Sequence, residues 1–575
     1  MFEEIATSYP QGAEFSSSFN GDSADKATSL TPQDSNLVLP SIQYDDIAPI
    51  ENVEFGNQKR NLLIGDSSND LIYAGSGNDL VFGKGGNNVL FGENGRDYLV
   101  GGADDDIFFG GNGRDLLIGS NGNDLLFGEK GADYLNGGDG EDVLKGGAGN
   151  DTLRGGHDKD IFVIGLDGGR DIIRDFEVGI DYIGLADGLT LDHLAIKQTR
   201  GHKALIQEKA SGKTLAILEG VNGRSISADD FVLADDLHPL EANSQNDELS
   251  VVGNWNTVFL QAAQDAGAGT PVVARLGAIL NLSIYDSVNG LNRQNDWGTQ
   301  YEQYAVDFED APELKSGRRS TAQDAAAIGA AHEALVNLLP DQRTSFDVQL
   351  IDSLRTVSKR EGVTQGFKWG RSVSTSILEL RADDGSDASD PYTPRTEIGG
   401  YDGTWGSQQY RNVTPFAIES VDQFEVDGPP DLTSEEYAES FDEVKRLGEL
   451  NSTERTEDQS EAAKFWQQAG GTTRPTGTWF KITTEYDENV DLTTSEASRL
   501  FALTGLAIAD SVVFVWDTKA DFAFWRPRDA VRSADLDGNP LTEADTNWEA
   551  FRGVGNQGSS PDYLSGQGTF SGAGS

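Results

Sequence analysis

The chain has no cysteine in 575 residues, and it has only five histidines and one methionine. The absence of cysteine excludes disulfide bonds, thiol catalysis and thiolate metal sites, and it fits export without an oxidative folding step. Basic residues are also scarce, with 44 Lys and Arg against 95 Asp and Glu, so the formal net charge is −51. A charge of this size argues against nucleic acid or an anionic membrane surface as a partner.

Long hydrophobic runs are missing as well. No run reaches the length of about eighteen apolar residues that a membrane span requires. The first forty residues are polar and acidic, without the basic and apolar tandem of a secretory signal. Residues 1–60 are rich in Ser, Asp and Gly, and we therefore predict a disordered leader there.

The most regular feature of the chain is a nine-residue repeat between residues 70 and 160. Each ninth residue is an aspartate, except at Asn88, and a large apolar residue follows two positions later. Glycines before the aspartate permit a tight turn, carboxylates and turn carbonyls supply the oxygen ligands that calcium prefers, and the apolar residue points into a shared core. The predicted calcium ligands are Asp70, Asp79, Asp97, Asp106, Asp115, Asp124, Asp133, Asp142, Asp151 and Asp160.

A flexible Gly/Asp-rich linker is the alternative, but a linker has no reason to keep an apolar residue in register over eleven units. The pattern Gly-Gly-x-Gly-x-Asp-x-apolar-x resembles the RTX (hemolysin-type) calcium-binding repeats over about a hundred residues. The resemblance implies a parallel β-roll in which each nonapeptide is a half-coil and calcium lies between stacked turns. At Asn88 we expect a missing or loosely held ion.

The remaining chain divides by composition. We predict the roll at residues 61–165, a β-rich cap at 166–236, a polar linker at 237–250 and a mostly α-helical domain at 251–575. In the last segment, Thr-x-x-Asp or Thr-x-x-Glu patterns predict helix starts at Thr321, Thr433 and Thr493. The stretch from residue 500 to residue 516 is apolar nearly all round, as in a helix at the centre of a bundle.

Two cations mark the stretch that carries chemistry. Lys519 and Arg526 are seven residues apart, so on one helix they would project from the same face. Beside a Ser565-Gly566 turn they would form a site for a tetrahedral oxyanion. The alternative is a pair of cations on a solvated helix surface.

Lys, six residues, Arg-Pro and a later Ser-Gly turn resemble the superfamily of type 2 phosphatidic acid phosphatases and vanadium-dependent haloperoxidases. The resemblance implies an all-α domain in which Lys519, Arg526, Ser565 and Gly566 hold vanadate or phosphate. Its activity would be halide oxidation by hydrogen peroxide, or hydrolysis of a small phosphoester. Flanking stretches that favour the bacterial haloperoxidase branch are Trp255-Asn256, Ile284–Asn289, Leu380–Ser386, Leu432–Tyr437, Phe524–Pro527 and Thr569–Ser571.

Two departures from the family pattern bear on activity. Gln567 stands where the family has its acid/base histidine, and glutamine cannot take a proton near neutral pH. The sequence ends at Ser575, before the family's second arginine and its ligand histidine, and we read His332 as structural. We therefore expect a fragment with an incomplete site.

Three functions remain open on this basis. The first is an exported, calcium-binding protein of the vanadium haloperoxidase type. The RTX resemblance implies export through a one-step type I exporter. The second is an acid phosphatase of the same fold. The third is a non-catalytic, calcium-dependent extracellular binding or scaffold protein, which Gln567 favours.

Overall fold

A computed structural model describes residues 47–575 except 200, 235–248, 293–300, 315–317, 358–361, 425, 467–471, 552–559, 564, 566–568 and 570–575. The chain divides into two compact units, and the boundary falls inside the repeat. One unit contains residues 40–116 and 236–575, and the other contains residues 1–39 and 117–235. Together the described residues form a parallel β-solenoid and a helical region.

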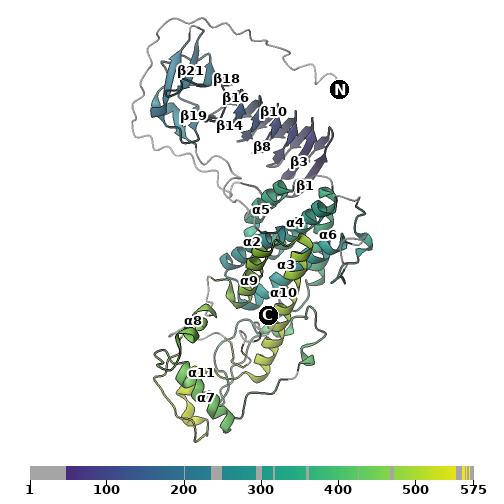
Figure 1. The fold of residues 1–575 in the computed structure, drawn as a ribbon, viewed down its shortest axis with the longest axis vertical. Coiled ribbons are helices and arrows are strands. Elements are labelled where there is room, and N and C mark those ends of the chain that lie inside the picture. The colour runs from purple at the N-terminus through teal and green to yellow at the C-terminus, as the bar shows by residue number, and fades with distance from the viewer. Residues whose placement is uncertain are drawn as a thin grey trace. The chain divides into compact units, whose positions relative to one another are not determined.

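In the larger unit, the repeat forms two parallel sheets. Each coil uses eighteen residues, because two nine-residue half-coils return the chain to the same sheet, and Leu71 accordingly pairs with Val89 and Leu80 with Tyr98. Figure 1 shows the strands as successive rungs. One sheet contains β1 (Asn52–Asn57), β3 (Asp70–Gly77), β5 (Val89–Phe91) and β8 (Ile107–Phe109), and the other contains β2 (Leu62–Ile64), β4 (Leu80–Lys84) and β7 (Tyr98–Gly102). Short strands at the turns are β6 (Asn94–Gly95) and β9 (Asn112–Gly113).

In the smaller unit, the repeat continues and then changes character. One sheet contains β11 (Leu125–Phe127), β14 (Val143–Lys145), β17 (Ile161–Ile164), β19 (Tyr182–Leu185) and β23 (Phe231–Leu233). The other contains β13 (Tyr134–Asp139), β16 (Thr152–His157), β18 (Asp171–Ile173), β22 (Thr214–Glu219), β21 (Lys203–Glu208) and β20 (Leu194–Gln198). β10 (Leu116–Asn121) spans the boundary, and β12 (Lys130–Gly131) and β15 (Ala148–Gly149) lie at turns. The pairs β20–β21 and β21–β22 are antiparallel, so the predicted β-rich segment ends the parallel stacking.

The apolar residue of each repeat forms the solenoid core, as the sequence predicts. Every one of these side chains is 0% exposed, and each contributes about 1.5–3 kcal/mol by burial. The set is Ile72, Val81, Leu90, Leu99, Phe108, Leu117, Leu126, Leu135, Leu144, Leu153 and Phe162.

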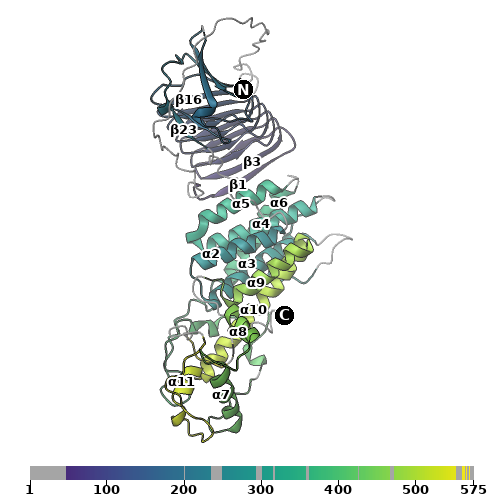
Figure 2. The ribbon, with the colours of Figure 1, turned by 60° about the vertical axis from the view of Figure 1, so that its left-hand side comes forward.

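The helical region is built around α3 (Thr270–Gly290), which packs against α4 (Arg319–Leu338), α6 (Val363–Leu380) and α10 (Thr494–Phe522). Figure 2 shows these helices side by side. A Cβ at Gly366 or Gly370 would lie 2.1 Å from the carbonyl oxygen of Ala322 or Ala326, so these glycines allow α4 and α6 to approach closely. The other helices are α2 (Val251–Asp265), α5 (Arg343–Thr356), α7 (Glu435–Leu447), α8 (Glu457–Trp466), α9 (Arg474–Val490) and α11 (Pro527–Arg532).

Of the three predicted helix starts, the one at Thr493 is confirmed. Its side chain accepts from the backbone N–H of Glu496, and a capping box begins α10. Thr321 is wrong as a start, because it lies inside α4. Thr433 is wrong by one residue, because its hydroxyl donates to Asp431 (2.6 Å) and Ser434 caps α7 instead.

Two further expectations need correction. The leader does not extend to residue 60, because β1 pairs with β3, while residues 1–46 and the linker residues 237–248 lie outside the described chain. α10 is not covered all round, because Leu503 is 48% exposed. Among the described helices, α10 is also the one long and apolar enough to cross a membrane, and 56% of its most apolar window is buried within the protein.

Candidate functional site

The ladder aspartates are buried and bonded to one another through the backbone. All ten are at most 2% exposed. Along each row, a carboxylate Oδ1 accepts from the backbone N–H of the ladder residue eighteen positions earlier, and this bond is made to Asp79, Asp97, Asp106, Asp115, Asp142, Asp151 and Asp160. Asp79 N–H donates to Asp97 (2.7 Å), and Asp133 N–H donates to Asp151 (2.8 Å). The structure thus brings the predicted calcium ligands into rows along the stacked turns.

The second carboxylate oxygen of several of these residues is buried without a hydrogen bond. In the part of the chain that the structure describes, Oδ2 of Asp79, Asp97 and Asp151 is buried and makes no hydrogen bond. A buried carboxylate oxygen without a partner costs several kcal/mol (about 2–7) unless a donor or cation meets it. The site therefore fits a cation.

The pKa values of the ladder aspartates also favour a bound cation. Burial raises the pKa of Asp97 to about 7, despite the hydrogen bond from the Asp79 backbone. Burial likewise raises the pKa of Asp106 to about 7 and that of Asp160 to about 8. Desolvation of the charged form explains each rise, and a divalent cation beside these carboxylates would oppose it.

The glycines of each turn leave room for the carboxylate. A Cβ at Gly119 would lie 2.0 Å from Oδ2 of Asp124, and one at Gly137 would lie 2.0 Å from Oδ2 of Asp142. Among the described residues, no three or more His, Asp or Glu side chains lie so that they could hold a metal ion by themselves. The remaining ligands would therefore be turn carbonyls, which calcium accepts readily.

Asn88 differs from the other rungs. Its Nδ2 donates to the carbonyl oxygen of Gly86 (2.8 Å) and to Oδ1 of Asp106 (2.8 Å), while its Oδ1 accepts from Asp70 N–H (3.0 Å). An amide N–H here meets acceptors that a carboxylate cannot meet. This geometry supports the prediction of a missing or loose ion at Asn88.

The two rows continue on either side of the predicted ladder. Asp171 and Asp181 continue the two rows, since they accept from the backbone N–H groups of Asp151 (3.1 Å) and Asp160 (3.0 Å). The spacing grows there to 20 and 21 residues, which hides them from a nine-residue register. Upstream, Asn61 and Asn52 stand at the same register before Asp70, and extending the count by two units would have found them.

In the helical region, Lys519 and Arg526 reach the same short segment. Lys519 is 5% exposed, and its Nζ donates to the carbonyl oxygen of Pro561 (2.7 Å). Arg526 Nε donates to the carbonyl oxygen of Ser560 (2.7 Å), and Nη2 donates to Ser560 Oγ (3.0 Å). The two cations therefore converge on residues 560 and 561.

The predicted reason for this convergence is wrong. α10 ends at Phe522, Ala523 adopts a left-handed conformation (φ 40°), and Arg526 is the N-cap residue of α11. The two cations thus lie on either side of a helix break instead of on one helical face.

The surroundings of this pair carry charge of both signs. Burial lowers the pKa of Lys519 to about 8, with Asp562 acting in the opposite direction. Four residues beyond Pro561, the Ser565 carbonyl accepts from Thr569 N–H (3.1 Å). Gly566 and Gln567 lie outside the described residues. Two cations, one buried, fit an oxyanion that would replace the carbonyl acceptors.

Both segments match known families. Four copies match the RTX calcium-binding nonapeptide repeat, at residues 55–90, 82–117, 109–144 and 136–173. Residues 499–575 match the VCPO second helical-bundle domain. These matches fall on the solenoid and on the segment with Lys519 and Arg526.

Individual relatives match over parts of the chain. Vanadium chloroperoxidase of Curvularia inaequalis is 33% identical over 171 residues, which are 25% of this chain and 27% of that protein. The chain thus spans about a quarter of the length of this relative. A bacterial vanadium-dependent iodoperoxidase structure has 19% identity and a TM-score of 0.44, covering 56% of this chain and 79% of the other.

The structure of the AlgE6R3 subunit of the Azotobacter vinelandii mannuronan C5-epimerase has 28% identity and a TM-score of 0.11, covering 25% of this chain and 91% of that one. The matches in sequence, without the similarities in structure, assign the two segments to these families. The chain therefore joins RTX calcium-binding repeats to a vanadium chloroperoxidase-type helical domain.

Proposed function

We propose that this chain is a calcium-binding, exported protein of the vanadium haloperoxidase type. The observation that supports calcium binding is the row of buried carboxylates whose second oxygens have no hydrogen bond at Asp79, Asp97 and Asp151. RTX repeats are typical of secreted proteins, and calcium modules of extracellular type bind at about 10⁻⁴–10⁻³ M. The repeats would then fold outside the cell, after passage through a type I exporter.

In the helical domain, Lys519 and Arg526 would hold vanadate. Vanadate, when bound, would activate hydrogen peroxide for the oxidation of halide. Lys519 would contribute a buried positive charge, and Arg526 would contribute parallel N–H donors to two oxygens of the oxyanion. Ser565 and Gly566 would complete the hydrogen bonds to these oxygens.

Proton transfer is the step that this chain does not support. Gln567 takes the position of the family's acid/base histidine, and an amide donates a hydrogen bond without accepting a proton near neutral pH. We therefore propose that this chain binds an oxyanion but turns over weakly or not at all. Gln567 thus favours a second candidate, a calcium-dependent extracellular scaffold that keeps the oxyanion pocket. A phosphatase role would need the same proton transfer.

Oxyanion binding tests this proposal. Orthovanadate and phosphate should bind near pH 7, and Lys519→Met should weaken phosphate binding about 10- to 100-fold, because one charge-assisted hydrogen bond is lost. Affinity should fall as pH rises through about 8, where Lys519 loses its proton. Isothermal titration calorimetry measures both effects.

Lys445 offers a matched control. Its Nζ donates to the carbonyl oxygen of Glu543, and not to Ser560 or Pro561, which Arg526 and Lys519 contact. Lys445→Met should bind phosphate like the unchanged protein. Equal affinity in Lys519→Met and in the control would contradict the proposed pocket.

A further inference from the structure

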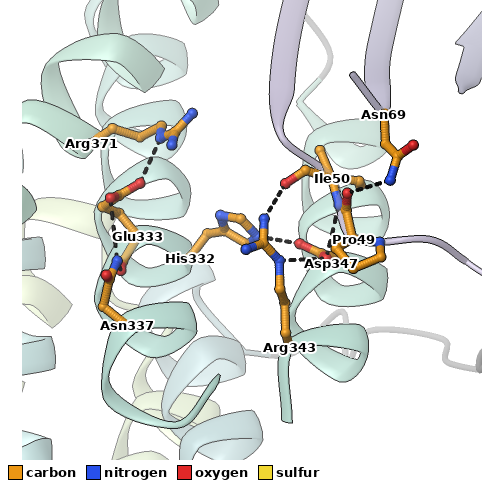
Figure 3. A network of polar contacts seen from close by, with 9 residues as sticks. All are labelled: Pro49, Ile50, Asn69, His332, Glu333, Asn337, Arg343, Asp347 and Arg371. Carbon is orange, nitrogen blue, oxygen red and sulfur yellow. Dashed lines mark hydrogen bonds and ion pairs between the residues drawn. The ribbon is translucent and has the colours of Figure 1, made fainter. Parts of the chain in front are cut away.

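The first coils of the solenoid are bonded to α4 and α5 within the larger unit. Ile50 N–H donates to Oδ2 of Asp347 (3.1 Å), and Arg343 donates to the Ile50 carbonyl oxygen. Asp347 is fully buried, and its Oδ1 lies 2.6 Å from Nε2 of His332. Figure 3 shows these side chains around Asp347, where helix and strand meet. The contact is therefore specific and is centred on a buried carboxylate.

Aromatic packing extends this contact along the sheet. Tyr73 donates through its hydroxyl to the Ile351 carbonyl oxygen (3.1 Å), and the ring of Phe55 meets that of Phe367 edge-on at 5.7 Å. The guanidinium of Arg355 lies 5.7 Å from the ring centre of Phe91. A solenoid needs a cap over its first apolar layer, and the helices supply it here.

The same coils carry amides in place of ladder carboxylates. Asn52 Nδ2 donates to Oδ1 of Asp70 (3.0 Å), and Asn61 Nδ2 donates to the Lys59 carbonyl oxygen and to Oδ1 of Asp79 (3.2 Å). Asn88 repeats this pattern with Gly86 and Asp106. Each amide thus donates hydrogen bonds to a carboxylate of the next coil or to a turn carbonyl. A carboxylate in its place could not donate them, and it would need a cation to link the same oxygens.

The consequence is visible at Asp70. Its Oδ1 accepts from Asn52 and its Oδ2 accepts from Asp66 N–H (3.0 Å), so both oxygens have donors. At Asp79 and Asp97, by contrast, Oδ2 is buried without a hydrogen bond among the described residues. The requirement for a cation therefore begins after Asp70.

We propose that the helical domain and residues 50–77 form a calcium-independent base, on which the coils from Asp79 onward fold when calcium binds. The inference rests on the proposed calcium binding. Because repeats are stabilised by their neighbours, a preformed coil gives the next coil a surface on which to form. Asp70 N–H, in the base, already donates to Oδ1 of Asn88 in the next coil (3.0 Å).

Hydrogen exchange of the full chain tests this proposal. In chelator, residues 97–116 and 117–160 should lose protection about 100-fold or more relative to about 10 mM calcium. Residues 50–77 and 343–356 should change less than about threefold. Loss of protection in the base equal to that in the later coils would overturn the proposal.

Calcium binding is measured on the same samples, so two failures can be told apart. Binding together with an unprotected base in chelator would overturn this inference and leave the proposed calcium function intact. No binding, and no response of residues 97–160 to chelator, would overturn both.

Amide-to-carboxylate variants give an independent test. Asn52→Asp with Asn61→Asp removes the two amide donors of the base, so the base should lose protection at least about tenfold in chelator and regain it with calcium. Asn78→Asp is the matched control, because the exposed Asn78 side chain acts as acceptor for Arg96 N–H and keeps that role. An unchanged base in the double variant would overturn the proposal.

Discussion

Gly138→Ala is expected to unfold the coil that contains it. Gly138 has φ +135°, and an added Cβ would lie 2.0 Å from the carbonyl oxygen of Ser120 in the adjacent coil. The clashing atom belongs to the backbone, and backbone hydrogen bonds hold the two coils together. Neither coil can therefore move away from the added Cβ. We expect a loss of about 3–5 kcal/mol in the free energy of unfolding of residues 117–235, measured by thermal melts in saturating calcium.

Gly201→Ala is the control for this substitution. A Cβ at Gly201 meets no atom within 4 Å, and its backbone is not left-handed. This variant should melt within about 0.5 kcal/mol of the unchanged protein. If Gly138→Ala melted with it, the stacked-turn geometry would be wrong.

Asp133→Asn with Asp151→Asn is expected to separate calcium binding from stability. In the unchanged protein, the backbone N–H of residue 133 donates to Asp151 Oδ1 (2.8 Å). Asparagine at residue 151 keeps this acceptor oxygen, while the double substitution removes two buried charges. The variant should bind fewer calcium ions than the unchanged protein. Without calcium it should be more stable by about 1–3 kcal/mol, because no buried carboxylate remains there to be desolvated. Equilibrium dialysis and chelator melts measure the two effects.

Exposed aspartates provide the matched pair. Asp158→Asn with Asp167→Asn removes the same charge from the surface of the same unit. This pair should leave the number of bound ions and the stability in chelator unchanged. Fewer ions in both double variants would mean that net charge, and not the buried rows, governs calcium binding.

The solenoid could be predicted from sequence because its period is local. Nine residues return each apolar side chain to the core, and Leu135 and Leu144 lie where that period puts them. Asp171 and Asp181 were hidden, because insertions in the preceding turns break the period while the stacking continues. A register counted along the sequence cannot follow a coil that changes length.

The contacts of the helical region could not be predicted in the same way. Asp347 and Ile50 are separated by 297 residues, and no pattern links a buried carboxylate on a helix to a distant backbone N–H. The seven-residue spacing predicted that Lys519 and Arg526 lie on one face of a single helix. That helix ends before Arg526, at the break at Ala523. Their common acceptors at residues 560 and 561 come from tertiary folding.

The central claim is that buried carboxylate rows hold calcium, and a calcium titration of the chelated full chain tests it most directly. Isothermal titration calorimetry counts the ions, while hydrogen exchange reports on residues 117–160. The account predicts several ions bound at about 10⁻⁴–10⁻³ M, with protection of these residues rising in step. A chain that binds no calcium at about 10 mM, with residues 117–160 equally protected in chelator, would contradict it.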